Sequence, residues 1–123
     1  MRPPLVFDLP FPPSLNNAYV NVPGVGRVKS SRSKAWFREA GWVVRAATGP
    51  ILGKIWPTER VAVEIELERR SGRRPDIDNV IKPILDLFQD MNIYGNDNQV
   101  DRIVIGYGPV TGVRVTVSVL TPA

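Results

Sequence analysis

Residues 74–101 read RPDIDNVIKPILDLFQDMNIYGNDNQVD, and they hold six of the twelve acidic residues of this 123-residue chain. Within this stretch, residues 78–90 carry apolar side chains at the i, i+3, i+4 and i+7 spacing that gives a helix one apolar side. These apolar residues are Ile81, Ile84, Leu85 and Phe88. Residues 92–98 are rich in Asn, which predicts a turn after the helix.

Strand patterns lie on both sides of this helix. Residues 60–68 alternate between apolar and polar side chains, which predicts a strand with one solvated face. Residues 5–9 form a short apolar run that prolines end, so they predict a first strand. Residues 100–105 and 113–119 alternate again, and we expect them to pair with each other as a closing hairpin.

The N-terminal third predicts a loop and a second helix. Residues 14–30 are rich in Asn, Gly and Pro, which indicates a loop with a small hairpin around its two central glycines. A helix capped by Ser31 or Ser33 is expected to continue to about Ala47. We therefore predict a single mixed α/β (α+β) domain over residues 1–123, with a small sheet of about four strands and two main helices.

Composition excludes several classes of protein. The chain has no Cys and no His, so disulfides, thiolate metal sites and Ser-His-Asp triads are all excluded. The proline-rich N-terminus does not resemble a signal peptide, and no run approaches the roughly 18 apolar residues of a membrane span. We expect a soluble, cytoplasmic protein without membrane contact, whose chemistry depends on carboxylates, lysine, hydroxyls or an oxygen-bound metal.

Charge is distributed unevenly along the chain, whose net charge is +4. Residues 1–57 hold eight Lys or Arg against two acids, whereas residues 76–123 hold three against six. The basic part can attract phosphates, and the acidic part can hold a metal that acts on one of them. This distribution fits a protein that binds nucleic acid, and it fits equally a small protein that is simply basic.

The acidic residues near the helix suggest a metal site. Asp76 and Asp78 lie at its start, and Asp78, Lys82 and Asp86 share one edge beside the apolar side. Asp97 follows in the turn, and we expect the chain to bring it back toward the first two. Three carboxylates without histidine suit Mg²⁺ or Mn²⁺ rather than zinc. Lys82 could then neutralise charge on a phosphate or orient the attacking water.

Each of these residues also fits a purely structural role. Asp78 could cap the helix, and Asp78 with Lys82 could form an i, i+4 ion pair. Asp97 stands between two Asn residues, which is an ordinary turn composition. An EF-hand loop is excluded, because Ile81 and Leu87 stand where Gly and Glu are required. Only the grouping of four charged residues favours a site.

The same stretch closely resembles the RusA family of Holliday-junction resolvases, which is common in bacteria, prophages and phages. The family pattern is Asp-x-Asp-Asn, a Lys four residues on, an Asp four beyond that, and later Asp-Asp-x-Gln-Val. It matches Asp76, Asp78, Asn79, Lys82, Asp86, Asp97, Gln99 and Val100. Weaker matches precede it, at Leu9–Ser14, Asn16, Asn17, Tyr19, Gly26, Arg27, Ser30 and Lys34–Arg38. One position departs from the pattern: Asn96 replaces the first Asp of the later pair.

The resemblance implies roles for these residues. Asp76, Asp78 and Asp97 are expected to bind Mg²⁺, with Mn²⁺ as a substitute, and Lys82 to be catalytic. Asp86, Asn79 and Asn96 are expected to support the site. The loss of charge at Asn96 would weaken metal binding if that position contributes to it.

The resemblance also implies a homodimeric crossover junction endodeoxyribonuclease that acts in DNA recombination and repair. Symmetric paired nicks in a four-way junction need two chains, because each chain has one acidic cluster. The candidates for DNA contact are Asn16, Asn17, Arg27, Lys29, Arg32, Lys34, Arg38, Arg69, Arg70, Arg73 and Arg74. Two alternatives stay open: a non-catalytic module that binds branched DNA, and a structure-selective nuclease that acts on forks or flaps.

Overall fold

Six strands and two long helices make up the part of the chain that the computed structural model describes, which is residues 3–13, 19–69 and 78–120. In order, the elements are β1 (Leu5–Leu9), β2 (Tyr19–Val22), β3 (Gly26–Lys29), α2 (Ser31–Thr48), β4 (Val61–Glu68), α3 (Asp78–Asp90), the 3₁₀ turn η1 (Asp97–Gln99), β5 (Val100–Gly108) and β6 (Val113–Val119). The predicted mixed α+β class, with two helices and a four-stranded main sheet, is confirmed.

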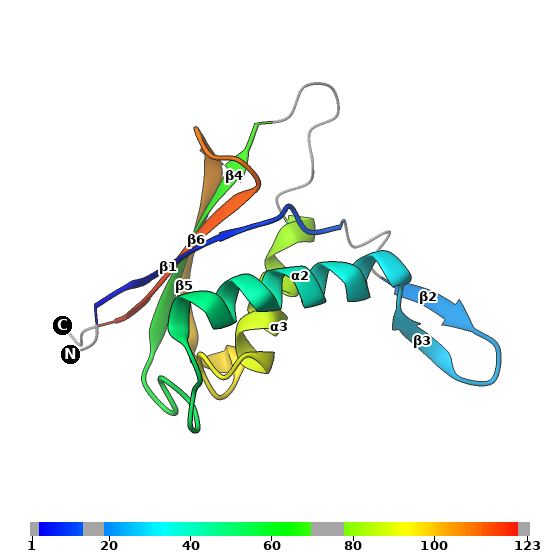
Figure 1. Cartoon of the computed structure of the whole chain (residues 1–123), viewed down its shortest axis with the longest axis horizontal. Helices are drawn as coiled ribbons and strands as arrows, with labels where there is room; N and C mark the ends of the chain where they lie inside the picture. Colours follow the sequence, from blue (N-terminus) through cyan, green and yellow to red (C-terminus); the bar gives the residue numbers. More distant parts are fainter. Residues whose placement is uncertain (1–2, 14–18, 70–77, 121–123) are drawn as a thin grey trace.

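The main sheet has the strand order β1-β6-β4-β5. Strand β6 is antiparallel to both β1 and β4, so that Val115 lies opposite Phe7 on one side and Ile65 on the other. Strand β5 is parallel to β4 at the edge of the sheet. Figure 1 shows both helices on the same side of this sheet.

The predicted closing hairpin between β5 and β6 is wrong, because β4 lies between these two strands. The chain passes from β4 through α3 to β5, and a helical crossover of this kind returns the next strand parallel to the first. Strand β6 then takes the place between β1 and β4, where Val113, Val115 and Val117 are all fully buried. Alternation identifies a strand but does not identify its neighbours.

The core lies between the sheet and the two helices. Helix α3 contributes Val80, Ile84, Leu87 and Phe88, all of them buried, and the Phe88 ring lies 5.2 Å from the Phe7 ring. The predicted helix limits are confirmed, but Ile81 and Leu85 are only partly buried. The buried apolar side therefore runs at i, i+4, i+7 and i+8 from Val80.

Helix α2 is capped by Ser30, one residue before the first of the two predicted caps. Ser30 is extended, and its hydroxyl accepts a hydrogen bond of 3.1 Å from the Ser33 N–H. Ser31 and Ser33 are therefore helical residues, and Ser30 is the cap. The Trp36 indole N–H donates to the Pro10 carbonyl oxygen over 2.8 Å, which ties α2 to the end of β1. None of the helices in the described ranges is long and apolar enough to cross a membrane.

Helix α3 ends in a Schellman motif, which sets the direction of the following turn. Asn92 adopts a left-handed conformation with φ of 63°, as residues at this position commonly do. The Asn92 N–H donates to the Gln89 carbonyl and the Ile93 N–H donates to the Phe88 carbonyl. Ile93 and Phe88 are both fully buried, which supplies the apolar contact that accompanies this motif.

Strands β2 and β3 form the small hairpin that the sequence predicts. The Val25 N–H donates to the Val22 carbonyl, with Pro23 and Gly24 between them and a Gly24 φ of 77°. Pro followed by Gly with a positive φ is the pattern of a type II turn. In Figure 1 the hairpin lies beyond the start of α2, on the side away from the main sheet.

Candidate active site

The first predicted carboxylates fall at the limit of the described residues. Asp76 lies outside them, and Asp78 is the first residue of α3, with its side chain and that of Asn79 outside the description. One turn further on, the Lys82 ammonium lies 3.4 Å from an Asp86 carboxylate oxygen. Lys82 therefore pairs with Asp86 in an i, i+4 geometry.

Asp97 begins the 3₁₀ turn η1, beside the last turns of α3. Its backbone N–H donates to the Gln89 side-chain oxygen over 3.1 Å, and its carboxylate is exposed. Asn96 caps this turn, because its side-chain oxygen accepts the Asn98 N–H at 2.9 Å. The residue that departs from the acidic pattern thus has a structural role that either Asn or Asp can fill.

A buried tyrosine links the turn after α3 to the helix itself. Tyr94 is fully buried, and its hydroxyl donates a 2.7 Å hydrogen bond to the Leu85 carbonyl oxygen. Burial raises the pKa of Tyr94, and the negative charges of Asp97 and then Asp86 raise it further. Sequence reasoning missed Tyr94, and a large aromatic residue in an otherwise polar turn is the signal that could have identified it.

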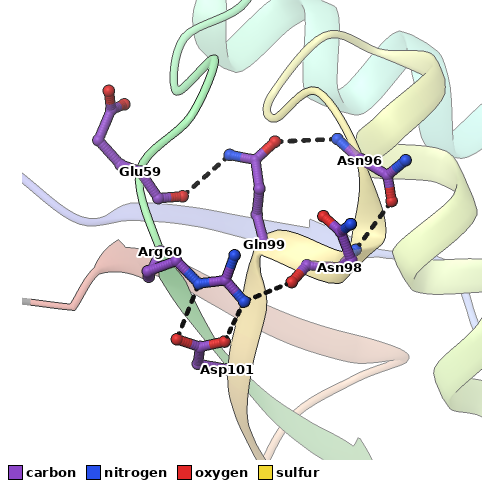
Figure 2. Close-up of polar contacts among 6 residues, drawn as sticks. All are labelled: Glu59, Arg60, Asn96, Asn98, Gln99 and Asp101. Carbon is purple, nitrogen blue, oxygen red and sulfur yellow. Dashed lines mark hydrogen bonds and ion pairs between the residues drawn. The ribbon is translucent and has the colours of Figure 1, made fainter.

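Hydrogen bonds of the Gln99 side chain join the turn that carries Asp97 to the loop before β4 (Figure 2). Its side-chain oxygen accepts the N–H groups of Gly95 at 2.8 Å and Asn96 at 2.9 Å. Its side-chain nitrogen donates to the carbonyl oxygens of Trp56 at 3.0 Å and Glu59 at 2.9 Å. Gln99 is only 5% exposed, and both of its N–H donors are used, so this residue has a clear positioning role. The sequence motif contains Gln99 but indicates no reason for it.

An exposed ion pair holds the other end of the same turn. Figure 2 shows the Arg60 guanidinium binding both oxygens of Asp101 and, over 2.6 Å, the Asn98 carbonyl oxygen. The hydrogen bond between them lowers the pKa of Asp101 and raises that of Arg60. The pair is open to solvent, so it orients the start of β5 more than it stabilises the protein.

The basic residues predicted to contact DNA are only partly placed. Arg27 on β3 and Arg32, Lys34 and Arg38 on α2 are exposed. Lys29 lies over the Phe37 ring at 3.8 Å and 4.0 Å from Asp90, so it joins the hairpin to both helices.

Of the remaining basic candidates, the structure describes Arg69, which follows β4. The Arg69 guanidinium lies 4.9 Å from the centre of the Tyr107 ring. The other predicted contacts lie outside the described residues: Asn16, Asn17, Arg70, Arg73 and Arg74. DNA contact by these residues stays a prediction.

The predicted metal site is likewise only partly placed. Within the described ranges, no three acidic residues gather closely enough to hold a metal ion. The predicted ligands include Asp76 and the side chain of Asp78, which lie outside these ranges, so the site of Asp76, Asp78 and Asp97 stays a prediction. The chain's candidate ligands are all oxygen atoms, and such a set fits Mg²⁺ or Mn²⁺.

Comparison with known proteins supplies the family. A search of curated proteins finds no match to this chain. The family model for the endodeoxyribonuclease RusA matches residues 10–119, which spans all the elements from α2 to β6 and every residue of the acidic motif. The chain therefore belongs to the RusA endodeoxyribonuclease family.

Proposed function

We propose that this protein is a Mg²⁺-dependent endonuclease that resolves four-way DNA junctions by paired, symmetric nicks, in recombination and repair. The observation that carries this proposal is the family match over residues 10–119. The position of Asp97 supports it, because its turn is held against α3 by hydrogen bonds from the Tyr94 hydroxyl to the Leu85 carbonyl and from the Asp97 N–H to the Gln89 side chain. The exposed basic residues of β3 and α2 provide charge that suits a polyanion.

Each of these side chains has its own role in the proposed reaction. Asp76, Asp78 and Asp97 would hold Mg²⁺, which when bound polarises a phosphodiester oxygen and lowers the pKa of a water molecule. Lys82 is more than half exposed and would face the phosphate, while Asp86 holds its ammonium in place. Gln99 and Tyr94 fix the turn beneath Asp97, so that its carboxylate keeps one position.

Asn96 would weaken the binding of the metal without altering the turn. Its side-chain oxygen caps η1 as an Asp oxygen would, so the geometry is kept while one negative charge is lost. We therefore expect nicking to need a higher Mg²⁺ concentration in this protein than in its Asn96→Asp variant.

Two nicks require two active sites. Each chain supplies one acidic motif, so we propose a homodimer whose two-fold axis matches that of the junction. Attack by water at each site would leave a 5′-phosphate and a 3′-hydroxyl that ligase can join.

The test uses a labelled synthetic four-way junction and a linear duplex of the same sequence. The wild type and Asp78→Asn are incubated with each DNA, in Mg²⁺ and in EDTA. We expect paired nicks in the junction alone, lost in EDTA and in the variant while binding persists. Binding without nicking in either Mg²⁺ or Mn²⁺ would leave a junction-binding module. Equal nicking of forks or flaps would leave a nuclease with broader structural selectivity.

A further inference from the structure

The β2–β3 hairpin exposes apolar side chains that the core does not use. Opposite residues of an antiparallel pair share a face, so Val20 and Val28 lie together, as do Val22 and Gly26. Val20 is 47% exposed, Val22 is 37% exposed, and Val25 at the tip is 70% exposed. Asn21 and Arg27 share the other face.

The tip of the hairpin is apolar and stiff. Pro23 and Val25 are its exposed side chains, and the type II turn between Val22 and Val25 is closed by a 3.0 Å backbone hydrogen bond. Proline fixes one backbone angle of the turn. Glycine supplies the positive φ that this turn requires, at Gly24.

The base of the hairpin is fixed next to the helix that carries the acidic motif. Lys29 lies over the Phe37 ring of α2 and 4.0 Å from Asp90, one turn after Asp86 on α3. A two-stranded ribbon is marginal by itself, so these contacts determine where the tip points. DNA that reached the end of α3 at Asp90 would lie near the base of the hairpin.

The charge around the hairpin indicates which kind of molecule binds its apolar face. Residues 19–38 contain five Lys or Arg and no Asp or Glu, and Arg32, Lys34 and Arg38 are exposed on α2 beside it. A second copy of this segment would be repelled, whereas a polyanion would be attracted. Three exposed valines also fall far short of the roughly 800 Å² per partner that a stable protein interface buries.

We propose that the β2–β3 hairpin opens the DNA branch point, with Pro23 and Val25 inserted between base pairs while the adjacent cations contact phosphates. Proteins that bend or open DNA insert apolar side chains, proline among them, between base steps in this way. A branch point is where stacking is already interrupted, so insertion there is least costly. The proposal rests on the proposed function, and it adds the element that selects branched over linear DNA.

The test places 2-aminopurine next to the branch point of a synthetic four-way junction, because this base becomes brighter when it is unstacked. Fluorescence and affinity are measured in EDTA, so that no strand is cut. The wild type should raise the fluorescence. Val25→Asn should lose most of that rise and about tenfold in junction affinity, with little change on linear duplex. Val25→Phe, a larger apolar tip, should keep or increase the rise.

Leu52→Asn provides the matched control, because Leu52 is 100% exposed in the loop that follows the other end of α2. It should retain both the rise and the affinity. An unchanged rise and affinity in Val25→Asn would overturn the proposal. A change from dimer to monomer on sedimentation of Val25→Asn would also overturn it, since the valines would then join two chains.

Nicking by the wild type in Mg²⁺ is scored separately, so the two proposals can fail independently. Nicking of the junction without any rise in fluorescence would overturn the hairpin inference and support the nuclease. A rise that depends on Val25 without nicking would support the hairpin inference and refute the nuclease.

Discussion

The turn over residues 92–101 and the hairpin over residues 19–29 differ in how they are held. The turn has an exposed carboxylate at Asp97, but its base is buried and hydrogen-bonded through Ile93, Tyr94 and Gln99. The hairpin has three of its four valines exposed and joins the two helices at its base, through Lys29. The comparison shows that a carboxylate that must keep one position is supported by buried hydrogen bonds. A side chain that must enter another molecule instead has to extend from the protein surface.

Breaking the hydrogen bonds of Gln99 should lower the free energy of unfolding substantially. Gln99 holds two backbone N–H groups and two carbonyl oxygens, through one buried and three partly buried hydrogen bonds. Leaving such groups without partners costs about 1 to 3 kcal/mol each, although water can reach some of them after a change. The hairpin has no comparable buried polar group in its described strands, so changes at its tip should leave stability almost unaltered.

Asp97→Asn should give the largest effect. We expect nicking to fall by at least about 100-fold, because even partners of metal ligands typically contribute 10- to 100-fold. Stability should not change, since the carboxylate is exposed and the bond to Gln89 uses the backbone N–H. Single-turnover nicking and urea unfolding check both parts. Asp101→Asn is the matched control, and a similar loss of nicking there would show that charge alone, and not position, matters.

Gln99→Leu should have the largest effect on folding. We expect the free energy of unfolding to fall by about 3 kcal/mol, because the four backbone groups lose their partner. Urea unfolding measures the change. Gln89→Leu, which removes one exposed bond to the same turn, should have a much smaller effect. A loss below about 0.5 kcal/mol in Gln99→Leu would mean that the turn is held by other contacts.

Tyr94→Phe should lower stability by about 1 kcal/mol at neutral pH, because the bond to the Leu85 carbonyl is lost. Its pH dependence has a defined sign. The folded state raises the pKa of Tyr94, so the associated stability is complete below the ordinary value near 10 and is lost as the pH rises through the folded value. Urea midpoints from pH 8 to 11 should therefore fall more steeply for the wild type than for the variant. Parallel curves would contradict this account.

The pair of Arg60 and Asp101 should give the smallest effect. The folded state lowers the pKa of Asp101, so its contribution is present above the ordinary value near 4 and is lost as the pH falls through the folded value. Asp101→Asn should flatten the acid limb of stability between pH 5 and 3 and leave nicking unchanged. A large loss of stability at pH 7 would show that this exposed pair does more than orient β5.

Local patterns predicted the elements, and long-range contacts decided what the patterns left open. The limits of α3 and the pairing of β2 with β3 follow from apolar spacing and from the Pro-Gly turn. The place of β6 between β1 and β4 does not, because alternation is the same beside any neighbour. Gln99 bonds to a loop about 40 residues earlier in the chain, and Tyr94 bonds to a carbonyl oxygen of α3. The spacing of residues in the sequence could not reveal either role.

The most direct test of the division between cutting and opening follows both events in one reaction, with the Asp97→Asn variant and the 2-aminopurine junction in Mg²⁺. The account predicts that fluorescence rises as in the wild type, with the same affinity, while no nicks form. Loss of the rise together with the nicks would contradict it, because the carboxylate turn would then be needed to hold the DNA and not only to cut it.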